Sequence, residues 1–266
     1  MDWLFKAVLT AGTVLLVMVA ARQGGRRLAG VVAALPTITA PTLAWLAHEQ
    51  GVAFAISAAI GSVAACGMLA VFALGYARAA RCGGGAAVAL VCGLGGAAVM
   101  ALPAEVASTH LANALTLALG SCAIAFVAMP SLGAEVASRQ RSRRSMFLVA
   151  ATAGTLTALA ATVGPSMGGF ATGLLSSLPL ITGAVAMIEH TACGHRAATH
   201  FLHGYVGGLF GKAAFGVAFA LLAPRVGAVA ALVLACACAC LMSMVRAREA
   251  PVQAASLPAR PSRGSE

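Results

Sequence analysis

Two short segments with the same pattern interrupt the apolar sequence of this chain. The first is "AALPTITAPT" (33–42) and the second is "SSLPLITGAV" (176–185), and they share Leu-Pro-x-Ile-Thr. A proline inside a helix removes a backbone donor and crowds the preceding turn. In lipid the freed carbonyl groups need new partners. The repeated pattern therefore predicts two related places where a membrane helix bends or breaks.

Composition places these segments in a membrane protein. The chain has 266 residues, of which 61% are hydrophobic and only 9% are charged, whereas about 25% of the residues in a soluble domain are charged. The net charge of +10 falls in short clusters between apolar runs, and not on one basic surface with interleaved aromatic residues. We therefore predict the lipid bilayer as the partner and no nucleic acid.

Apolar stretches long enough to cross a bilayer, about 20 residues each, occur nine times. The predicted fold class is an all-α integral membrane protein with about nine transmembrane helices. The predicted spans are 3–21, 28–48, 52–77, 84–102, 106–128, 146–165, 168–190, 197–223 and 226–246.

The basic residues predict the orientation of these spans. Placing the loop "RQRSRR" (139–144) in the cytoplasm also brings ten other arginines there, so that 14 of the 17 basic residues are cytoplasmic. Such a skew indicates a bacterial inner-membrane protein with a periplasmic N-terminus and a cytoplasmic C-terminus. The ten other arginines are Arg22, Arg26, Arg27, Arg78, Arg81, Arg196, Arg246, Arg248, Arg260 and Arg263.

One shift of the sequence against itself places Pro36 on Pro179, and we call this shift the repeat offset. At this offset the match extends beyond the Leu-Pro-x-Ile-Thr pattern, which indicates an internal duplication. Without a gap it aligns Gly30 with Gly173 and Gly51 with Gly194, and matched glycines and prolines mark special backbone positions. It also aligns the first span with a mid-chain segment, which argues against a cleaved signal peptide. Because the aligned spans run in opposite directions, we predict an inverted-topology repeat of five plus four helices.

This repeat divides the chain into four predicted parts. They are a first repeat of five helices (1–128), a basic cytoplasmic linker (129–145), a second repeat of four helices (146–247) and a disordered cytoplasmic tail (248–266).

Each Leu-Pro-x-Ile-Thr segment has two interpretations. One is a kinked helix whose hydroxyl groups bond to its own carbonyls. The other is a broken helix near the bilayer midplane, where exposed backbone groups bind a substrate. The candidate substrate-binding residues are Pro36, Thr37, Thr39, Ser177, Pro179 and Thr182.

Lys212 is the ionisable residue deepest inside a predicted span. It lies in "GGLFGKAAFG" (207–216), about a dozen residues from either end, and its counterpart in the first repeat is Leu69. A lysine at the centre of a membrane helix costs about 2.5–3.5 kcal/mol on insertion scales. We therefore predict that it faces a cavity and binds substrate, with snorkelling to the interface as the alternative.

Histidines and glutamates lie near the predicted span ends. His48 with Glu49 and Glu189 with His190 are interpreted either as interfacial caps or as proton-coupling gates. His200 and His203 share a helical face. We interpret them as proton-coupling residues or as polar side chains at the cytosolic mouth of the pathway, with a transition-metal site as the alternative. Most of the eight cysteines fit packing positions, with a soft-metal site at Cys236 and Cys240 as the alternative, and we assign no metal or cofactor.

The segment "LAGVVAALPTITAPTLAWLAHEQG" (28–51), which follows a first span and a basic turn, resembles the GlpM-type family of small inner-membrane proteins. In that family the second helix likewise follows a short polar turn and carries Gly and Pro before a polar end. The resemblance covers somewhat more than half of the first repeat and a matching stretch of the second. It implies an inner-membrane protein duplicated within one chain, and no reaction or site residues. The layout is also similar to inverted-repeat secondary transporters.

These observations predict a secondary transporter or permease for a small solute, with an anion favoured. A non-transporting membrane scaffold or accessory subunit is the alternative, and a homo-oligomer is compatible with both. No HExxH or acidic metal motif occurs in the sequence, so we predict no enzyme, with histidine-dependent intramembrane catalysis as the remaining alternative.

Overall fold

The computed structural model describes residues 34–130 and 166–255, together with the isolated positions 8, 11, 12, 31, 155, 162 and 163. Within these ranges the regular secondary structure is entirely helical. Most of the predicted span 3–21, of the basic linker 129–145 and of the span 146–165 lies outside the described residues.

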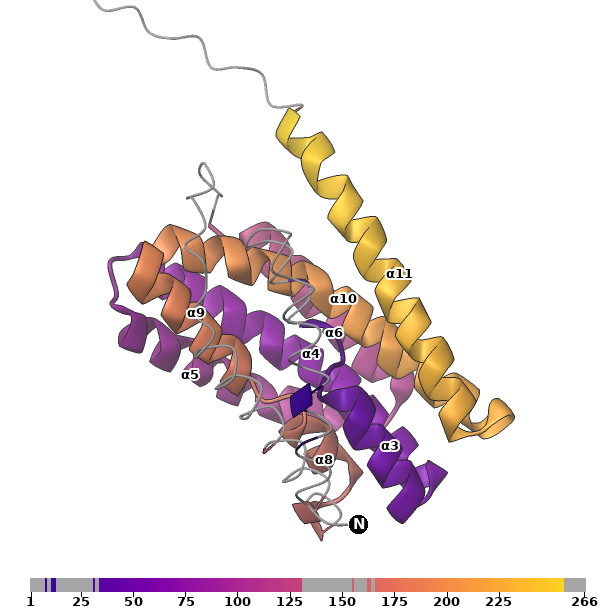
Figure 1. Cartoon of the computed structure of the whole chain (residues 1–266). Coiled ribbons are helices and arrows are strands. Elements are labelled where there is room, and N and C mark those ends of the chain that lie inside the picture. The colour runs from indigo at the N-terminus through magenta and orange to yellow at the C-terminus, as the bar shows by residue number, and fades with distance from the viewer. Residues whose placement is uncertain are drawn as a thin grey trace, which may run out of the picture.

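Two long helices form the centre of the molecule (Figure 1). They are α4 (Val52–Arg81), with 30 residues, and α10 (His195–Val226), with 32 residues, and they pack against each other. Each begins directly after a glycine with a positive φ angle, +90° at Gly51 and +83° at Gly194. This conformation is readily adopted only by glycine. A sharp turn of the same kind therefore introduces both central helices.

The central helices run antiparallel. Gly216, in the second half of α10, lies against Ala59 and Val63 in the first half of α4. Near the other end of α4, the Tyr76 hydroxyl lies 3.3 Å from Nδ1 of His190, a few residues before α10 begins. The start of α10 therefore lies beside the end of α4.

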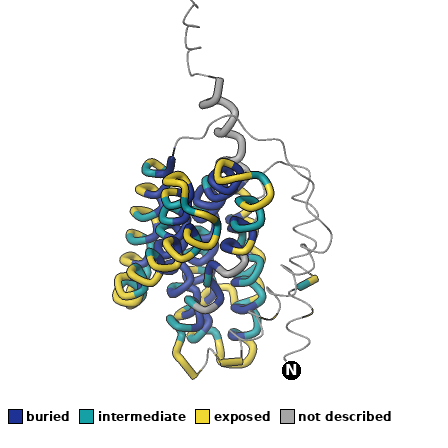
Figure 2. The backbone as a smooth tube through the Cα atoms, turned by 90° about the vertical axis from the view of Figure 1, so that its left-hand side faces the viewer, coloured by how far each residue is buried: buried dark blue, intermediate teal, exposed yellow. Residues whose placement is uncertain are grey.

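Three further helices pack on this pair. They are α5 (Ala86–Ala107) and α6 (Leu111–Ala128), which contact α4, and α11 (Ala228–Ala255), which contacts α10. Buried positions concentrate in the interior, whereas much of the periphery is exposed (Figure 2). The exposed side chains of α5 and α6 include Val99, Leu102 and Val127. An apolar outer face of this kind is suited to contact with lipid.

Both Leu-Pro-x-Ile-Thr segments interrupt helical structure. The first is a turn at residues 35–38 that leads into α3 (Thr39–Glu49), and the second is a turn at 176–179 between two short helices. These two helices are α8 (Gly169–Leu175) and α9 (Leu180–Cys193).

Equivalent hydrogen bonds close the two turns. The Ala40 amide donates to the Pro36 carbonyl at 2.8 Å, and the Gly183 amide donates to the Pro179 carbonyl at 2.7 Å. Proline is tolerated here because it stands at the start of a helix, where its missing N–H removes no helical hydrogen bond.

The structure agrees with part of the predicted span count. Four helices, α4, α5, α6 and α10, are long and apolar enough to cross a membrane, and they coincide with predicted spans. The nine-helix arrangement itself is not shown. The predicted spans 28–48 and 168–190 are divided by the two turns, and α3 and α9 alone, with 11 and 14 residues, are shorter than the roughly 20 residues a crossing needs.

The predicted disordered tail needs one correction. Helix α11 continues to Ala255, so residues 248–255 of the segment predicted to be disordered are helical. The run "RAREA" (246–250) consists of strong helix formers, which extend a helix past the end of its apolar part. Residues 256–266 lie outside the described part of the chain.

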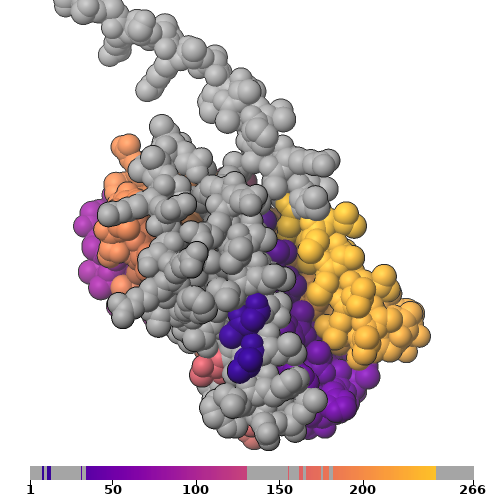
Figure 3. Space-filling view, in the orientation of Figure 1, coloured from indigo at the N-terminus to yellow at the C-terminus, as the bar shows by residue number. Residues whose placement is uncertain are grey.

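The helix contacts recur at the repeat offset. The contact between α4 and α5 corresponds to that between α10 and α11, and α3 with α4 corresponds to α9 with α10. Across the two halves, α3 contacts α11 and α9 contacts α5. In the space-filling view α11 and α3 adjoin on one side of the molecule, and α5 and α9 lie on the other (Figure 3).

Glycines allow close approach where the halves meet. A Cβ on Gly208 of α10 would lie 2.7 Å from the Ala34 Cβ and 2.7 Å from the Val31 carbonyl oxygen. A Cβ on Gly173 of α8 would overlap the Ala58 carbonyl oxygen of α4. These two contacts join each central helix to the broken segment of the other half.

Candidate binding site

Lys212 is buried in the middle of α10. Its side chain is 7% exposed, and its nitrogen Nζ donates a hydrogen bond of 3.0 Å to Ser177 Oγ. A snorkelling lysine extends its charged end toward water, whereas this one is held inside the protein by a buried hydroxyl. Lys212 therefore lies inside the bundle, and its role in a substrate cavity stays a prediction.

Ser177 belongs to the second turn, directly before Leu178 and Pro179. Its amide donates to the Leu174 carbonyl at 2.9 Å, and its side chain is 3% exposed. Because the helix stops here, the Ser177 hydroxyl is directed across to α10 and α4 and not along its own helix. The interruption thus places a hydroxyl group beside the buried lysine.

The central helix α4 adds a second hydroxyl and a thiol. Ser62 Oγ lies 3.2 Å from Ser177 Oγ, and the Cys66 thiol donates to the Ser62 carbonyl at 3.5 Å. Lys212, Ser177 and Ser62 therefore form a continuous buried chain of hydrogen-bonding groups, which we call the lysine–serine cluster. It joins α10, the α8–α9 turn and α4.

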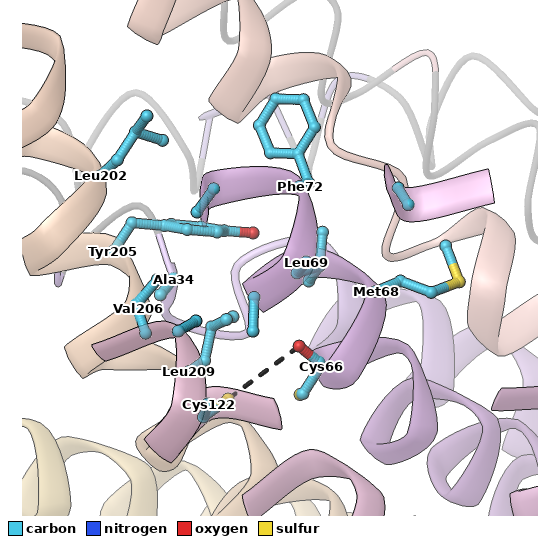
Figure 4. Close-up of a cluster of buried hydrophobic side chains, with 14 of the residues drawn as sticks. Ala34, Cys66, Met68, Leu69, Phe72, Cys122, Leu202, Tyr205, Val206 and Leu209 are labelled. Atoms are coloured by element: carbon cyan, nitrogen blue, oxygen red, sulfur yellow. Dashed lines mark hydrogen bonds between the residues drawn. The ribbon is translucent and has the colours of Figure 1, made fainter. Parts of the chain in front are cut away.

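A second polar contact lies on the same face of α10. Tyr205 is 4% exposed, and its hydroxyl group interacts with the side chain of Thr182, the threonine of the second Leu-Pro-x-Ile-Thr pattern. Figure 4 shows Tyr205 and Leu209 on the side of α10 that faces Leu69 of α4. In the same cluster, the Cys122 thiol of α6 donates to the Cys66 carbonyl oxygen at 4.0 Å.

The lysine–serine cluster contains a basic group and no acidic partner. Among the described residues, the buried polar and charged side chains include no carboxylate, and Ser177 is the one hydrogen-bond partner of Lys212 Nζ. A buried cation ordinarily pairs with an anion. The arrangement is therefore suited to bind an anionic group from outside the chain.

The predicted site residues of the first repeat are not part of this cluster. Thr39 is buried and Thr37 is half-buried, and the Thr37 amide donates to the Leu35 carbonyl at 2.7 Å. Within the described ranges, no hydrogen bond joins Pro36, Thr37 or Thr39 to the lysine–serine cluster. The structure thus joins Ser177 to Lys212 and Thr182 to Tyr205, while Pro179 is buried at the start of α9.

The predicted gate residues lie at helix ends. His48 and Glu49 are exposed at the end of α3, and Glu189 and His190 are half-buried near the end of α9. The His190 ring packs edge-on against Tyr76, with ring centroids 6.0 Å apart. His190 thereby connects α9 to the end of α4.

His200 and His203 lie inside α10, several residues past its start. His200 is 7% exposed, and the His203 ring packs against Phe126 of α6 with ring centroids 4.3 Å apart. In the described part of the chain, no three His, Cys, Asp or Glu side chains are grouped so that they could hold a metal ion. His200 is therefore buried within the bundle, and His203 lies between α10 and α6.

Sequence reasoning did not identify Ser62, Cys66, Tyr76 or Tyr205. A signal was present, because Tyr76 and Tyr205 are the only two tyrosines in the chain and both lie inside predicted apolar spans. The repeat offset also carries Ser62 onto Tyr205. Hydroxyl groups at equivalent positions of two apolar helices are candidates for a shared polar site.

Comparison of the chain with family models, with curated proteins and with solved structures gave no match. The resemblance to GlpM-type proteins therefore stays a prediction, and the argument for function depends on the geometry of the lysine–serine cluster.

Proposed function

We propose that this protein is a secondary transporter or permease that carries a small anionic solute across a bacterial inner membrane. The solute binds between Lys212 and Ser177, with Ser62 as a further hydrogen-bond donor. The N-terminus is periplasmic and the C-terminus is cytoplasmic, as the distribution of arginines predicts.

One observation carries this proposal, namely the 3.0 Å contact between Lys212 Nζ and Ser177 Oγ at a helix break. An intramembrane lysine is costly, and such residues commonly line substrate pathways. Broken helices commonly build transporter binding sites, because they expose backbone groups and side-chain hydroxyls inside the membrane. The combination of both features is not required for a scaffold.

The recurring helix contacts support the proposed inverted repeat. The repeat offset carries the first residue of α4 onto the first residue of α10, each helix follows a positive-φ glycine, and the two run antiparallel. The contacts of α3 with α11 and of α9 with α5 are related by the same offset. Two halves related in this way can move against each other about a central site, which is the usual basis of alternating access.

Basic residues at one end of the bundle support the proposed orientation. Arg78 and Arg81 end α4, and Arg196 lies at the start of the antiparallel α10. Arg78 also donates a hydrogen bond of 3.4 Å to the Ala128 carbonyl, which brings the end of α6 to the same place. This end is the cytoplasmic one by the positive-inside rule.

Anion-dependent stabilisation of the purified protein tests the proposal. Thermal unfolding is measured in detergent with a series of sodium salts of small monovalent anions, among them chloride, nitrate, formate and lactate. A ligand that binds the folded state raises the free energy of unfolding by RT ln(1 + [L]/Kd), and the unfolding temperature rises with it. We expect at least one anion to stabilise the wild-type protein and to enter liposomes that contain it.

Neighbouring serines provide a matched control. Ser176 and Ser177 are both 3% exposed, but Ser176 Oγ bonds to the Gly173 carbonyl in its own segment at 2.8 Å. Stabilisation and uptake should be lost in Lys212→Met and Ser177→Ala and retained in Ser176→Ala. Equal anion stabilisation in Lys212→Met and wild type would refute the proposed site, and absence of uptake with normal insertion would favour the scaffold.

A further inference from the structure

The hydrogen bonding of Lys212 bears on the charge of its side chain. An ammonium group has three N–H donors, and Ser177 Oγ is the one acceptor that the described residues offer it. A charged group buried without a counter-ion or a full set of hydrogen bonds is strongly destabilised. A neutral amine at the same position needs fewer acceptors and no counter-ion.

Within the part of the chain that the structure describes, the groups that face Lys212 do not supply the missing negative charge. From α4 the titratable group that interacts with it is the Cys66 thiol, a group that is neutral unless deprotonated. The titratable groups of the neighbouring α6, and of α11 up to Ser243, are cysteines as well. They are Cys122, Cys236, Cys238 and Cys240. The carboxylates Glu49 and Glu189 belong to the last turns of α3 and α9, whereas Lys212 lies in the middle of α10.

Electroneutrality then links two binding events. Binding an anion to the neutral amine would place an uncompensated negative charge in the bundle, and protonating the amine alone would place an uncompensated positive charge there. Binding both forms an ammonium–anion pair with no net charge. In a low-dielectric site this pair is the favourable loaded state.

We propose that Lys212 is an uncharged amine when no anion is bound and that the site takes up one monovalent anion together with one proton. The proton is held on Lys212 Nζ, and the anion accepts hydrogen bonds from the resulting ammonium and from Ser177 and Ser62. This inference rests on the proposed function and names the proton as the ion that is coupled to transport. Movement of the loaded site across the membrane carries no net charge, so uptake is electroneutral proton–anion symport.

The sequence allows the charge of this one amine to be observed directly. Lys6 and Lys212 are the only lysines in the chain, so Lys6→Arg protein labelled with 15N at the lysine Nζ gives a single side-chain signal. The 15N chemical shift and the number of attached protons distinguish an amine from an ammonium. Lys6→Arg/Lys212→Met serves as the matched control, in which the signal must be absent.

We expect an amine signal near neutral pH in Tris gluconate and an ammonium signal at the same pH after addition of chloride or formate. An ammonium signal in gluconate would overturn the inference while leaving anion transport intact. An amine that stays uncharged with both chloride and formate would overturn proton–anion uptake. Loss of all anion-dependent stabilisation, in contrast, would count against the proposed function itself.

A chloride gradient across liposomes gives a second readout. With a pH indicator trapped inside, inward chloride movement through the wild-type protein should acidify the interior without generating a membrane potential. Lys212→Arg keeps a permanent cation at the site, so its chloride movement should no longer acidify the interior. Chloride uptake by the wild-type protein without acidification would overturn the coupling and leave the transporter assignment standing.

Discussion

The behaviour expected of Lys212 depends on how far its side chain lies from water, because a lysine by itself does not indicate a binding site. Near a helix end the same side chain could extend to the interface. In the middle of α10 it reaches Ser177 instead, and Ser177 is available because the helix stops there. The buried amine of Lys212 therefore lies beside a break in a neighbouring helical segment, and this break supplies hydroxyl groups.

Replacing Lys212 should stabilise the protein. A methionine of similar length in Lys212→Met removes a buried polar group without creating a large cavity, so we expect the free energy of unfolding to rise by about 1 kcal/mol or more. Thermal unfolding in detergent without added anion measures the change. A lower unfolding temperature for Lys212→Met would mean that the lysine contributes to folding and would weaken its assignment to binding.

The alanine variants of the two adjacent serines should differ in stability, because the two hydroxyl groups have different hydrogen-bond partners. Ser177→Ala removes the acceptor of Lys212 Nζ and a neighbour of Ser62 Oγ, so we expect it to destabilise the fold by about 1–3 kcal/mol. Ser176→Ala removes only a bond to the Gly173 carbonyl and should cost about 1 kcal/mol or less. Equal losses in thermal unfolding would contradict the lysine–serine cluster.

At the scale of helices, the broken segments are held by backbone contact and not by large side chains. Helix α8 has only seven residues and no side-chain N-cap bond. It lies so close to α4 that Gly173 and Gly61 both adjoin backbone atoms of the facing helix. Small residues at helix contacts are the usual means of close packing in membranes.

This packing makes Gly173 intolerant of any side chain. The Cβ of Gly173→Ala would overlap the Ala58 carbonyl oxygen and lie 2.7 Å from the Ser62 amide nitrogen, so α8 must move. We expect a loss of about 1–3 kcal/mol, as for other overpacked sites. Gly120→Ala on α6 is the matched control, because its Cβ meets no atom within 4 Å.

Thermal unfolding distinguishes the two variants. The control should be neutral or more stable by up to about 1 kcal/mol, since alanine favours helix over glycine. A Gly173→Ala protein as stable as Gly120→Ala would show that α8 does not approach α4 this closely.

At the scale of the whole molecule, α4 links the two ends of the bundle. Its 30 residues span about 45 Å at 1.5 Å per residue, which exceeds the roughly 30 Å hydrocarbon core. Gln50 before the helix and Cys82 after it are both exposed. They should therefore lie on opposite sides of the membrane.

Labelling with a membrane-impermeant maleimide tests this topology. Cys82 should react in inverted vesicles and not in intact spheroplasts, because the arginines at its end of α4 are expected to be cytoplasmic. Gln50→Cys, introduced together with Cys82→Ser and Cys193→Ser, should show the reverse. Labelling of both positions from one side would contradict a membrane crossing by α4, and exchanged labelling would reverse the proposed orientation.

Much of the fold can be predicted from the sequence because membrane helices leave strong local signals. Length and hydropathy locate α4, α5, α6 and α10 to within a few residues, and the repeated proline pattern locates both turns. The repeat offset anticipates that α4 and α10 begin at equivalent positions. The helical extension of α11 through residues 248–255 is not predicted, because its composition is typical of a polar tail.

Sequence by itself determined the residue types of the candidate site, namely a lysine in an apolar span and serines and threonines beside two prolines. Only the tertiary structure decided which of them meet. The Ser177 hydroxyl reaches Lys212, whereas Thr37 and Thr39 of the first turn have no hydrogen bond to it within the described residues. The physical reason is that contacts across antiparallel helices depend on packing distance and on the side of each helix that faces its neighbour. A local sequence pattern does not encode this distance or this orientation. For that reason only the structure shows that Ser62 lies beside Ser177 and Tyr205 beside Thr182.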